Sequence, residues 1–167
     1  FTLGVPIFNR YDYEEKRTTG MFVSTLPFLI EIDERWTFAA FNRALGERWY
    51  ELLRHQRLPY EEISAIARAQ GAGSERLFRV ALSFQSSQIL KSPDASVVFS
   101  GRWHYGGYQS EQLCIHLTNM LDGRSFSVDY DFLAQLFTAE EIERLHGHVV
   151  RILLEALAHP ARPLSEL

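Results

Sequence analysis

The sequence predicts an α+β lobe, in which a mixed β-sheet carries its helices mainly on one face. Two stretches, residues 78–85 and 126–132, alternate apolar and polar side chains with the period of two that is typical of strands. Two longer stretches, residues 37–56 and 138–158, repeat apolar side chains at the three- and four-residue steps of an amphipathic helix. Strands and helices of these lengths pack as layers around one core, which gives the α+β class.

Length and composition limit the function classes. The 167 residues suffice for one domain or lobe, and the apolar fraction of 46% is that of an ordinary globular protein. The net charge of −4, with acids and bases interspersed, argues against nucleic acid as a partner. The sequence has no membrane-length apolar run and no signal peptide, and its single cysteine, Cys114, excludes an internal disulfide, so we expect a cytoplasmic protein. The chain opens on Phe1 within an apolar run, from which we expect a piece of a longer protein.

The first third of the chain predicts two strands. Phe1–Phe8 is a short strand, and Asn9–Thr19 is a charged loop with two interleaved tyrosines. Residues 20–32 are strongly apolar, so we expect a fully buried strand with Pro27 at its entry or at an irregularity.

Two helices follow. Thr37 is a suitable N-cap for a helix that runs to about Gln56. Gly46 inside this helix costs about 1 kcal/mol relative to alanine, which indicates a close approach by another element. A second helix is expected over Tyr60–Gln70, before the flexible segment 71–74.

The second half predicts further strands and a last helix. Strands are expected at 78–85, 97–103, 113–118 and 126–132, the last two joined by a hairpin turn at Asp122–Gly123. Thr138 caps the last helix, and Glu141 completes a capping box. This helix is expected to end near His159, and its buried stripe comprises Ile142, Leu145, Val149, Ile152, Leu153 and Ala156.

The residues alone do not define a reaction. The sequence has no glycine-rich phosphate loop, no CxxC pair and no HExxH motif. His146 and His148 lie on different faces of a helix and cannot share a metal, so no metal site is predicted. Cys114 and His116 share one face of a strand, where they are interpreted as an ordinary pair.

Five segments in order resemble the second half of a condensation domain of nonribosomal peptide synthetases. The opening TLGVPIFNR resembles a strand that leads into a loop flooring the active-site channel. TGMFVSTLPF resembles the Gly-x-Phe-Val-Asn-Thr motif, with Ser24 in place of the asparagine. LLRHQRLPYEEI resembles the His-Gln-Asp-x-Pro-Phe-Glu motif, with Arg57 in place of the acid. SERLFRVALSFQ and the stretch from Ser127 to Leu167 resemble the segments that follow, so the resemblance covers essentially the whole chain.

The resemblance implies one lobe of a two-lobe, chloramphenicol-acetyltransferase-like fold. Domains of this family join an acyl or peptidyl group on one carrier protein to the amine of an aminoacyl group on another. Their His-His-x-x-x-Asp-Gly motif lies in the first lobe, and this sequence has no adjacent histidine pair. Residues 1–167 therefore resemble the non-catalytic C-terminal lobe, with residues 160–167 as the start of an exit linker.

The resemblance also implies site residues and partners. Asn9, Arg10, Ser24 and Thr25 are candidates for the channel and its floor loop, although Ser24 and Thr25 also suit a purely structural role. His55, Gln56, Pro59 and Tyr60 form either a carrier-facing surface or a turn that packs on the sheet. The implied partners are the N-terminal lobe, peptidyl carrier proteins and neighbouring synthetase domains such as adenylation domains. No cofactor binds directly, because phosphopantetheine arrives on the carriers.

Two other functions stay open. One is an acyltransferase of the same superfamily that uses coenzyme A, and the other is a scaffold or docking domain without turnover. Condensing, cyclising, epimerising and ester-forming relatives are not separated by this half. The chain alone is expected to be inactive and to expose an apolar face where the first lobe docks.

Overall fold

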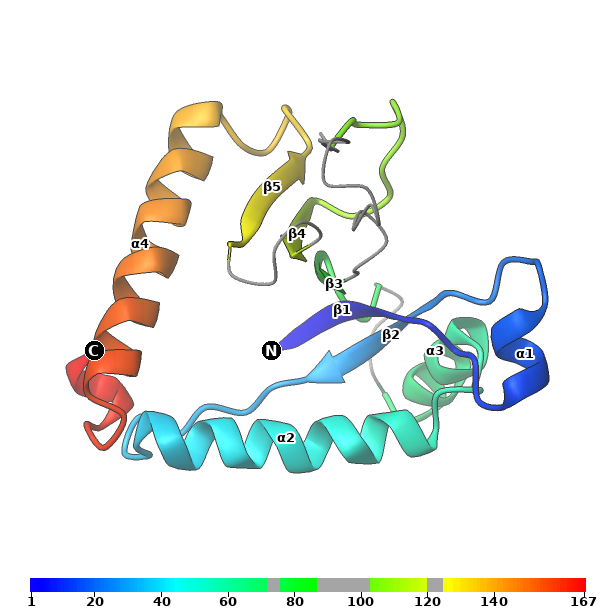
Figure 1. Ribbon diagram of the computed structural model, residues 1–167, viewed down its shortest axis with the longest axis horizontal. Helices are drawn as coiled ribbons and strands as arrows, with labels where there is room; N and C mark the ends of the chain where they lie inside the picture. The colour runs from blue at the N-terminus through cyan, green and yellow to red at the C-terminus, as the bar shows by residue number, and fades with distance from the viewer. Residues whose placement is uncertain (72–75, 87–102, 120–124) are drawn as a thin grey trace, which may run out of the picture.

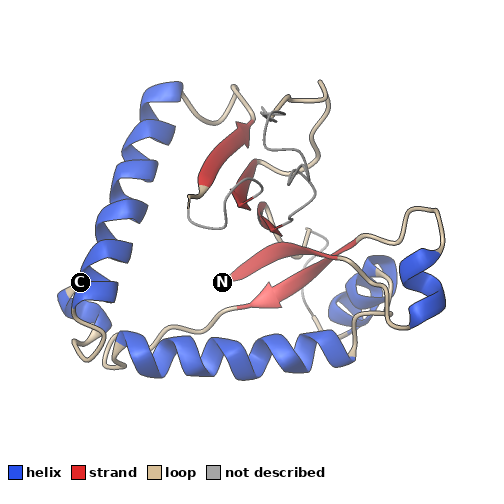
Figure 2. Cartoon of the chain, viewed as in Figure 1, coloured by secondary structure: helices blue, strands red, loops and turns tan. Residues whose placement is uncertain are grey.

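The structure is a computed structural model, which describes residues 1–71, 76–86, 103–119 and 125–167. Its centre is one five-stranded sheet in the order β2-β1-β3-β4-β5, which is mixed as predicted (Figures 1 and 2). The strands are β1 (Thr2–Ile7), β2 (Ser24–Leu29), β3 (Val80–Ser86), β4 (Leu113–Asn119) and β5 (Ser127–Phe132). The two outer pairs, β1–β2 and β4–β5, are antiparallel, whereas β1–β3 and β3–β4 are parallel.

The helices lie mainly on one face of this sheet, as predicted. The long helices are α2 (Phe38–Arg54) and α4 (Ala139–Ala158). Trp49 of α2 packs edge-on against Phe28 of β2, and His146 of α4 packs edge-on against Tyr130 of β5. The strand register places Phe28 and Tyr130 on the same face, because side chains alternate between faces along each strand. The shorter α3 (Tyr60–Ala69) lies at the β2 edge (Figure 1).

The strand expected over residues 20–32 is shorter and less buried than predicted. β2 lies at the edge of the sheet, and only its inward-facing Leu26 and Phe28 are buried. Pro27 stands within the strand, not at its entry. Since proline has no N–H, it is tolerated at an edge, where an outward-facing N–H is not needed by a neighbouring strand. The apolar composition therefore identified a strand but misjudged its position in the sheet.

The segment between β1 and β2 also differs from the prediction. It was expected to be a loop over Asn9–Thr19, but it contains a short helix, α1 (Tyr13–Arg17). The Asp12 side chain caps this helix by accepting a hydrogen bond from the Glu15 N–H at 2.8 Å. An Asp three residues before a Glu is a helix-start signal, and here it begins a helix within the charged segment.

The two helices with threonine caps, α2 and α4, begin where the sequence predicts. The Thr37 side chain accepts a hydrogen bond from the Ala40 N–H, and Thr138 and Glu141 form the complete capping box. Two other expectations for these helices are wrong. No heavy atom of another described element comes within 4 Å of the position of a Gly46 Cβ. In α4 only Ile142 and Ala156 of the predicted stripe are buried, while Val149, Ile152 and Leu153 are exposed.

Several predicted features fall outside the described residues. The hairpin turn at Asp122–Gly123 and most of the strand expected at 97–103 belong to this group, although β4 and β5 do pair as that turn requires. Trp103 itself is described and is not in a strand.

The end of the chain packs against the segment that precedes α2. Backbone hydrogen bonds join Leu164 to Trp36 and Ser165 to Glu34, and Thr37 pairs with Pro163 as an isolated bridge. The short 3₁₀ helix η1 (Leu164–Glu166) completes this contact. In the described part of the chain, no helix has the length and apolarity needed to cross a bilayer.

Candidate functional site

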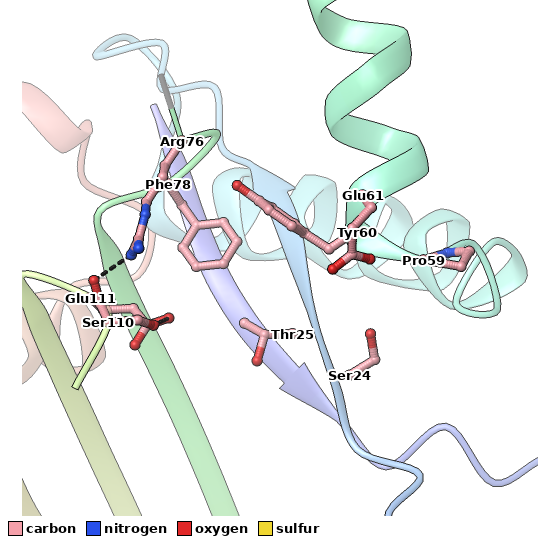
Figure 3. Close-up of a pocket in the computed structure, with 9 residues that line it drawn as sticks. All are labelled: Ser24, Thr25, Pro59, Tyr60, Glu61, Arg76, Phe78, Ser110 and Glu111. Atoms are coloured by element: carbon pink, nitrogen blue, oxygen red, sulfur yellow. Dashed lines mark hydrogen bonds between the residues drawn. The ribbon is translucent and has the colours of Figure 1, made fainter. Parts of the chain in front are cut away.

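An open pocket of about 440 Å³ lies beside the start of β2 (Figure 3). We call it the Ser24–Tyr60 pocket; its lining residues are Ser24, Thr25, Pro59, Tyr60, Glu61, Arg76, Phe78, Ser110 and Glu111. It brings together residues from two motifs that are separated by more than thirty positions in the sequence. The first motif supplies the hydroxyl groups of Ser24 and Thr25, and the second supplies Pro59 and Tyr60.

Two aromatic rings form the central wall of this pocket. Tyr60 and Phe78 meet edge-to-face with their ring centroids 5.5 Å apart. The Phe78 ring covers Gly4 of β1 so closely that a Cβ there would lie less than 3.0 Å from three ring atoms. Glycine at this position therefore allows Phe78 to lie flat on the sheet.

The Tyr60 hydroxyl forms a hydrogen bond with the backbone. Its oxygen accepts a hydrogen bond from the Leu77 N–H at 3.2 Å. A phenol can accept and donate at the same time, so the Tyr60 proton stays available to an acceptor in the pocket. The Arg76 guanidinium, by contrast, donates to the Ser110 carbonyl and so joins two sides of the lining (Figure 3).

The predicted floor-loop residues divide into two groups. Ser24 and Thr25 line the pocket, whereas Asn9 and Arg10 do not. Arg10 donates to the carbonyls of Glu15, Thr18 and Gly20, and its guanidinium lies 4.0 Å from the centroid of the Phe22 ring. Asn9 has φ = 49°, and its buried Oδ1 atom has no hydrogen-bond partner among the described residues. Arg10 therefore organises its own loop.

The four residues predicted from the second motif also fall into two groups. Pro59 and Tyr60 belong to the Ser24–Tyr60 pocket, while His55 and Gln56 line a separate hollow of about 430 Å³. We call this hollow the turn pocket; its lining residues are Tyr11, Arg54, His55, Gln56, Arg57 and Leu58. His55 Nε2 lies 3.5 Å from Glu51 Oε1 within the same helix.

A polar cluster on the face of the sheet that points away from α2 and α4 was not predicted. His116 Nε2 lies 3.2 Å from Asp131 Oδ2, and the Trp103 indole stacks on the imidazole with centroids 4.0 Å apart. The Trp103 Nε1–H also donates to Asp131 Oδ2 at 3.0 Å. The pairing of β4 with β5 places His116 and Asp131 on one face, and this register is a long-range property that the local sequence pattern does not define.

Cys114 is on the same face as His116, and it is not set up as a nucleophile. Burial raises the pKa of the Cys114 thiol to about 12, and the nearby carboxylates of Glu111 and Asp131 contribute to this rise. Its Sγ lies 3.8 Å from Glu111 Oε2. Among the described residues, no group of three or more His, Cys, Asp or Glu side chains is arranged to hold a metal ion.

These features define a class of protein: an α+β lobe with a mixed sheet, helices mainly on one face and a pocket that is open to the surface. The whole chain, residues 1–167, matches the family model described as the condensation domain. The chain therefore belongs to the condensation-domain family.

Individual relatives agree with this assignment. The chain is 31% identical over 159 residues to surfactin synthase subunit 1 of Bacillus subtilis (strain 168), covering 95% of the chain and 4% of that protein. It is 30% identical over 159 residues to a plipastatin synthase of the same organism, covering 95% of the chain and 6% of that protein. The chain thus spans a small part of these synthases.

Solved structures show the same fold. The first condensation domain of the CDA synthetase superposes with a TM-score of 0.72 at 23% identity, covering 99% of this chain and 36% of that one. A four-domain nonribosomal peptide synthetase bound to AMP and glycine gives a TM-score of 0.78 at 19% identity, with 99% and 14% coverage. These likenesses show that the chain has the α+β fold of the matching part of these proteins.

Proposed function

We propose that this chain is the C-terminal, non-catalytic lobe of a condensation domain that forms an amide bond between a carrier-bound donor and a carrier-bound aminoacyl acceptor. The observation that supports this most is the Ser24–Tyr60 pocket, because two separate family motifs converge on it. The pocket is open on one side, which suits a wall that a second lobe completes. Family membership supports the reaction class.

In this proposal the lobe binds and orients a phosphopantetheine arm and the acyl group attached to it. The arm has amide groups that both donate and accept hydrogen bonds, and the hydroxyls of Ser24, Thr25 and Tyr60 can satisfy them. Because the Tyr60 oxygen already accepts from Leu77, we assign Tyr60 the role of donor to a carbonyl. Phe78 and Tyr60 supply an apolar wall that displaces water from the arm.

The reacting histidine would come from the other lobe, since this sequence has no adjacent histidine pair. That histidine would orient or deprotonate the acceptor amine, which attacks the donor thioester. The amide forms as the thioester bond breaks, and the thiol leaves on the donor carrier. The peptidyl carriers, the N-terminal lobe and a neighbouring adenylation domain are the partners that the proposal requires.

The test uses the full-length protein with loaded carriers and mass spectrometry of the acceptor carrier. We expect an amide product from an acyl-carrier donor and none from acyl-coenzyme A. Product from acyl-coenzyme A alone would favour the coenzyme A acyltransferase, and no product from either donor would favour a scaffold domain. The isolated chain is expected to give no product.

Tyr60→Phe tests the pocket within that assay. The substitution keeps the edge-to-face contact with Phe78 and removes the hydroxyl, which is both the proposed proton donor and the acceptor for the Leu77 N–H. Loss of one such hydrogen bond corresponds to about a two- to ten-fold lower kcat/KM. Tyr50→Phe is the matched control, because Tyr50 is exposed and does not line the pocket. An unchanged kcat/KM in Tyr60→Phe would contradict the role of this hydroxyl.

A further inference from the structure

Hydrogen bonds from Arg10 hold together the segment between β1 and β2, which we call the braced segment. Arg10 donates to the Thr18 carbonyl at 2.6 Å and to the Gly20 carbonyl at 2.9 Å, as well as to Glu15. Its guanidinium also lies over the Phe22 ring. The two ends of the segment are therefore tied to one cation, so that the segment moves as a unit.

One contact ties this unit to a distant part of the chain. Arg57, in the turn between α2 and α3, lies 2.6 Å from Glu15 Oε1 in α1. The Arg57 guanidinium also lies 5.6 Å from the centroid of the Tyr11 ring. Glu15 uses its second oxygen, Oε2, to accept the Tyr11 N–H at 2.6 Å. We call this set, formed by Arg57, Glu15 and Tyr11, the Arg57 contact.

The other cations of the turn do not make such a link. Arg54 pairs with Glu51 at 3.4 Å, three residues away on the same helix, and His55 approaches the same carboxylate. These pairs stabilise the end of α2 but do not reach α1. Arg57 stands where the family motif has an acid, so the residue that departs from the motif is the one that makes the link.

The Arg57 contact joins the two chain segments that lead into the Ser24–Tyr60 pocket. The braced segment leads through Gly20 into Ser24 and Thr25, and the turn leads through Arg57 into Pro59 and Tyr60. A displacement of α1 relative to the turn therefore changes the separation of these walls.

We propose that Arg57 is a positioning residue, which holds α1 against the α2–α3 turn and thereby sets the width of the Ser24–Tyr60 pocket. The importance of that width rests on the proposed function, whereas the Arg57 contact itself does not. Arg57 acts through Glu15 and Tyr11 and does not line the Ser24–Tyr60 pocket.

The test is a double-mutant cycle in the full-length protein, measured by hydrogen exchange of peptides that cover residues 11–27. Arg57→Gln removes the cation, and Glu15→Gln removes the charge but keeps an oxygen for the Tyr11 N–H. We expect each single variant to exchange about two- to five-fold faster, as suits a partly exposed ion pair. The double variant should show no further increase, because the two residues act through one contact.

Three further measurements make the cycle decisive. Arg54→Gln removes a neighbouring cation of the turn pocket and should leave residues 11–27 unchanged. Arg57→Lys keeps the charge and should recover part of the protection. High salt should bring the wild-type exchange toward that of Arg57→Gln. Additive effects of the two single variants, or an equal effect of Arg54→Gln, would overturn the proposal, and neither result depends on whether the domain forms amides.

Discussion

At the scale of single residues, Cys114 shows how neighbouring side chains determine the reactivity of a thiol. In the sequence it is a lone cysteine two positions from a histidine, and the two are interpreted as an ordinary pair on one strand face. In the structure its environment is negative and partly buried, with Glu111 and Asp131 close by, and the pKa of the thiol rises to about 12. The thiolate is the reactive form, so this environment suppresses reactivity.

We therefore predict that Cys114 reacts slowly with iodoacetamide in the folded protein. Since each pKa unit changes the thiolate fraction about tenfold, labelling at mildly alkaline pH should be at least about a hundred-fold slower than in denaturant. Mass spectrometry of the labelled protein over time measures this ratio. Rapid labelling of the folded chain would contradict the prediction, and the denatured sample serves as the control for reagent activity.

The residue scale also shows what the sequence could not reveal about the candidate site. Ser24, Thr25, Pro59 and Tyr60 were predicted from motifs, and the structure places all four in one pocket. Arg76, Phe78, Ser110 and Glu111, which complete the lining together with Glu61, were not predicted as site residues. They reach the pocket only through the β1–β3 and β3–β4 pairing, which is a long-range property that local patterns do not encode.

At the scale of elements, the sequence predicted the helices and strands well wherever a local rule applies. The caps at Thr37 and Thr138 and the period-two stretches depend on neighbouring residues only, and they are confirmed. The position of β2 at the edge of the sheet and the exposure of α4 depend on what packs beside them. The apolar composition of β2 does not show whether it lies at the edge or at the centre of the sheet, because both kinds of strand can have the same composition.

The two glycines Gly4 and Gly46 yield opposite predictions for the same substitution. Gly4→Ala places a methyl group against the Phe78 ring and should lower the free energy of unfolding by about 1–3 kcal/mol. Gly46→Ala adds a methyl group in open space within α2 and should raise it by about 0.5–1 kcal/mol. Denaturant unfolding of both variants measures the difference.

The combination Gly4→Ala with Phe78→Leu is the control for the Gly4 prediction. Because leucine is smaller than phenylalanine, the double variant should lose less stability than the two single changes added together. Simple additivity would show that the Phe78 ring is not the cause. A destabilising Gly46→Ala would show that α2 does meet another element at that position.

At the scale of the whole molecule, α4 leaves much of its apolar surface exposed. Its exposed apolar side chains include Val149, Val150, Ile152, Leu153, Leu154 and Leu157, which lie on more than one side of the helix. An amphipathic helix of a complete globular domain exposes a mainly polar face. The chain corresponds to 36% of the solved CDA condensation domain, so most of the surface of such a domain is contributed by other residues.

We predict that the isolated chain self-associates through the exposed apolar side chains of α4. Leu154 and Leu157 are 62% and 61% exposed, and burying a leucine contributes about 1.5–3 kcal/mol. Leu154→Glu combined with Leu157→Glu should therefore lower the association constant, measured by sedimentation velocity over a range of concentrations. Leu136→Glu is the matched control, because Leu136 is a similarly exposed leucine outside α4. A wild-type chain that stays monomeric at high concentration, or an equal effect of Leu136→Glu, would mean that the apolar surface of α4 does not drive association.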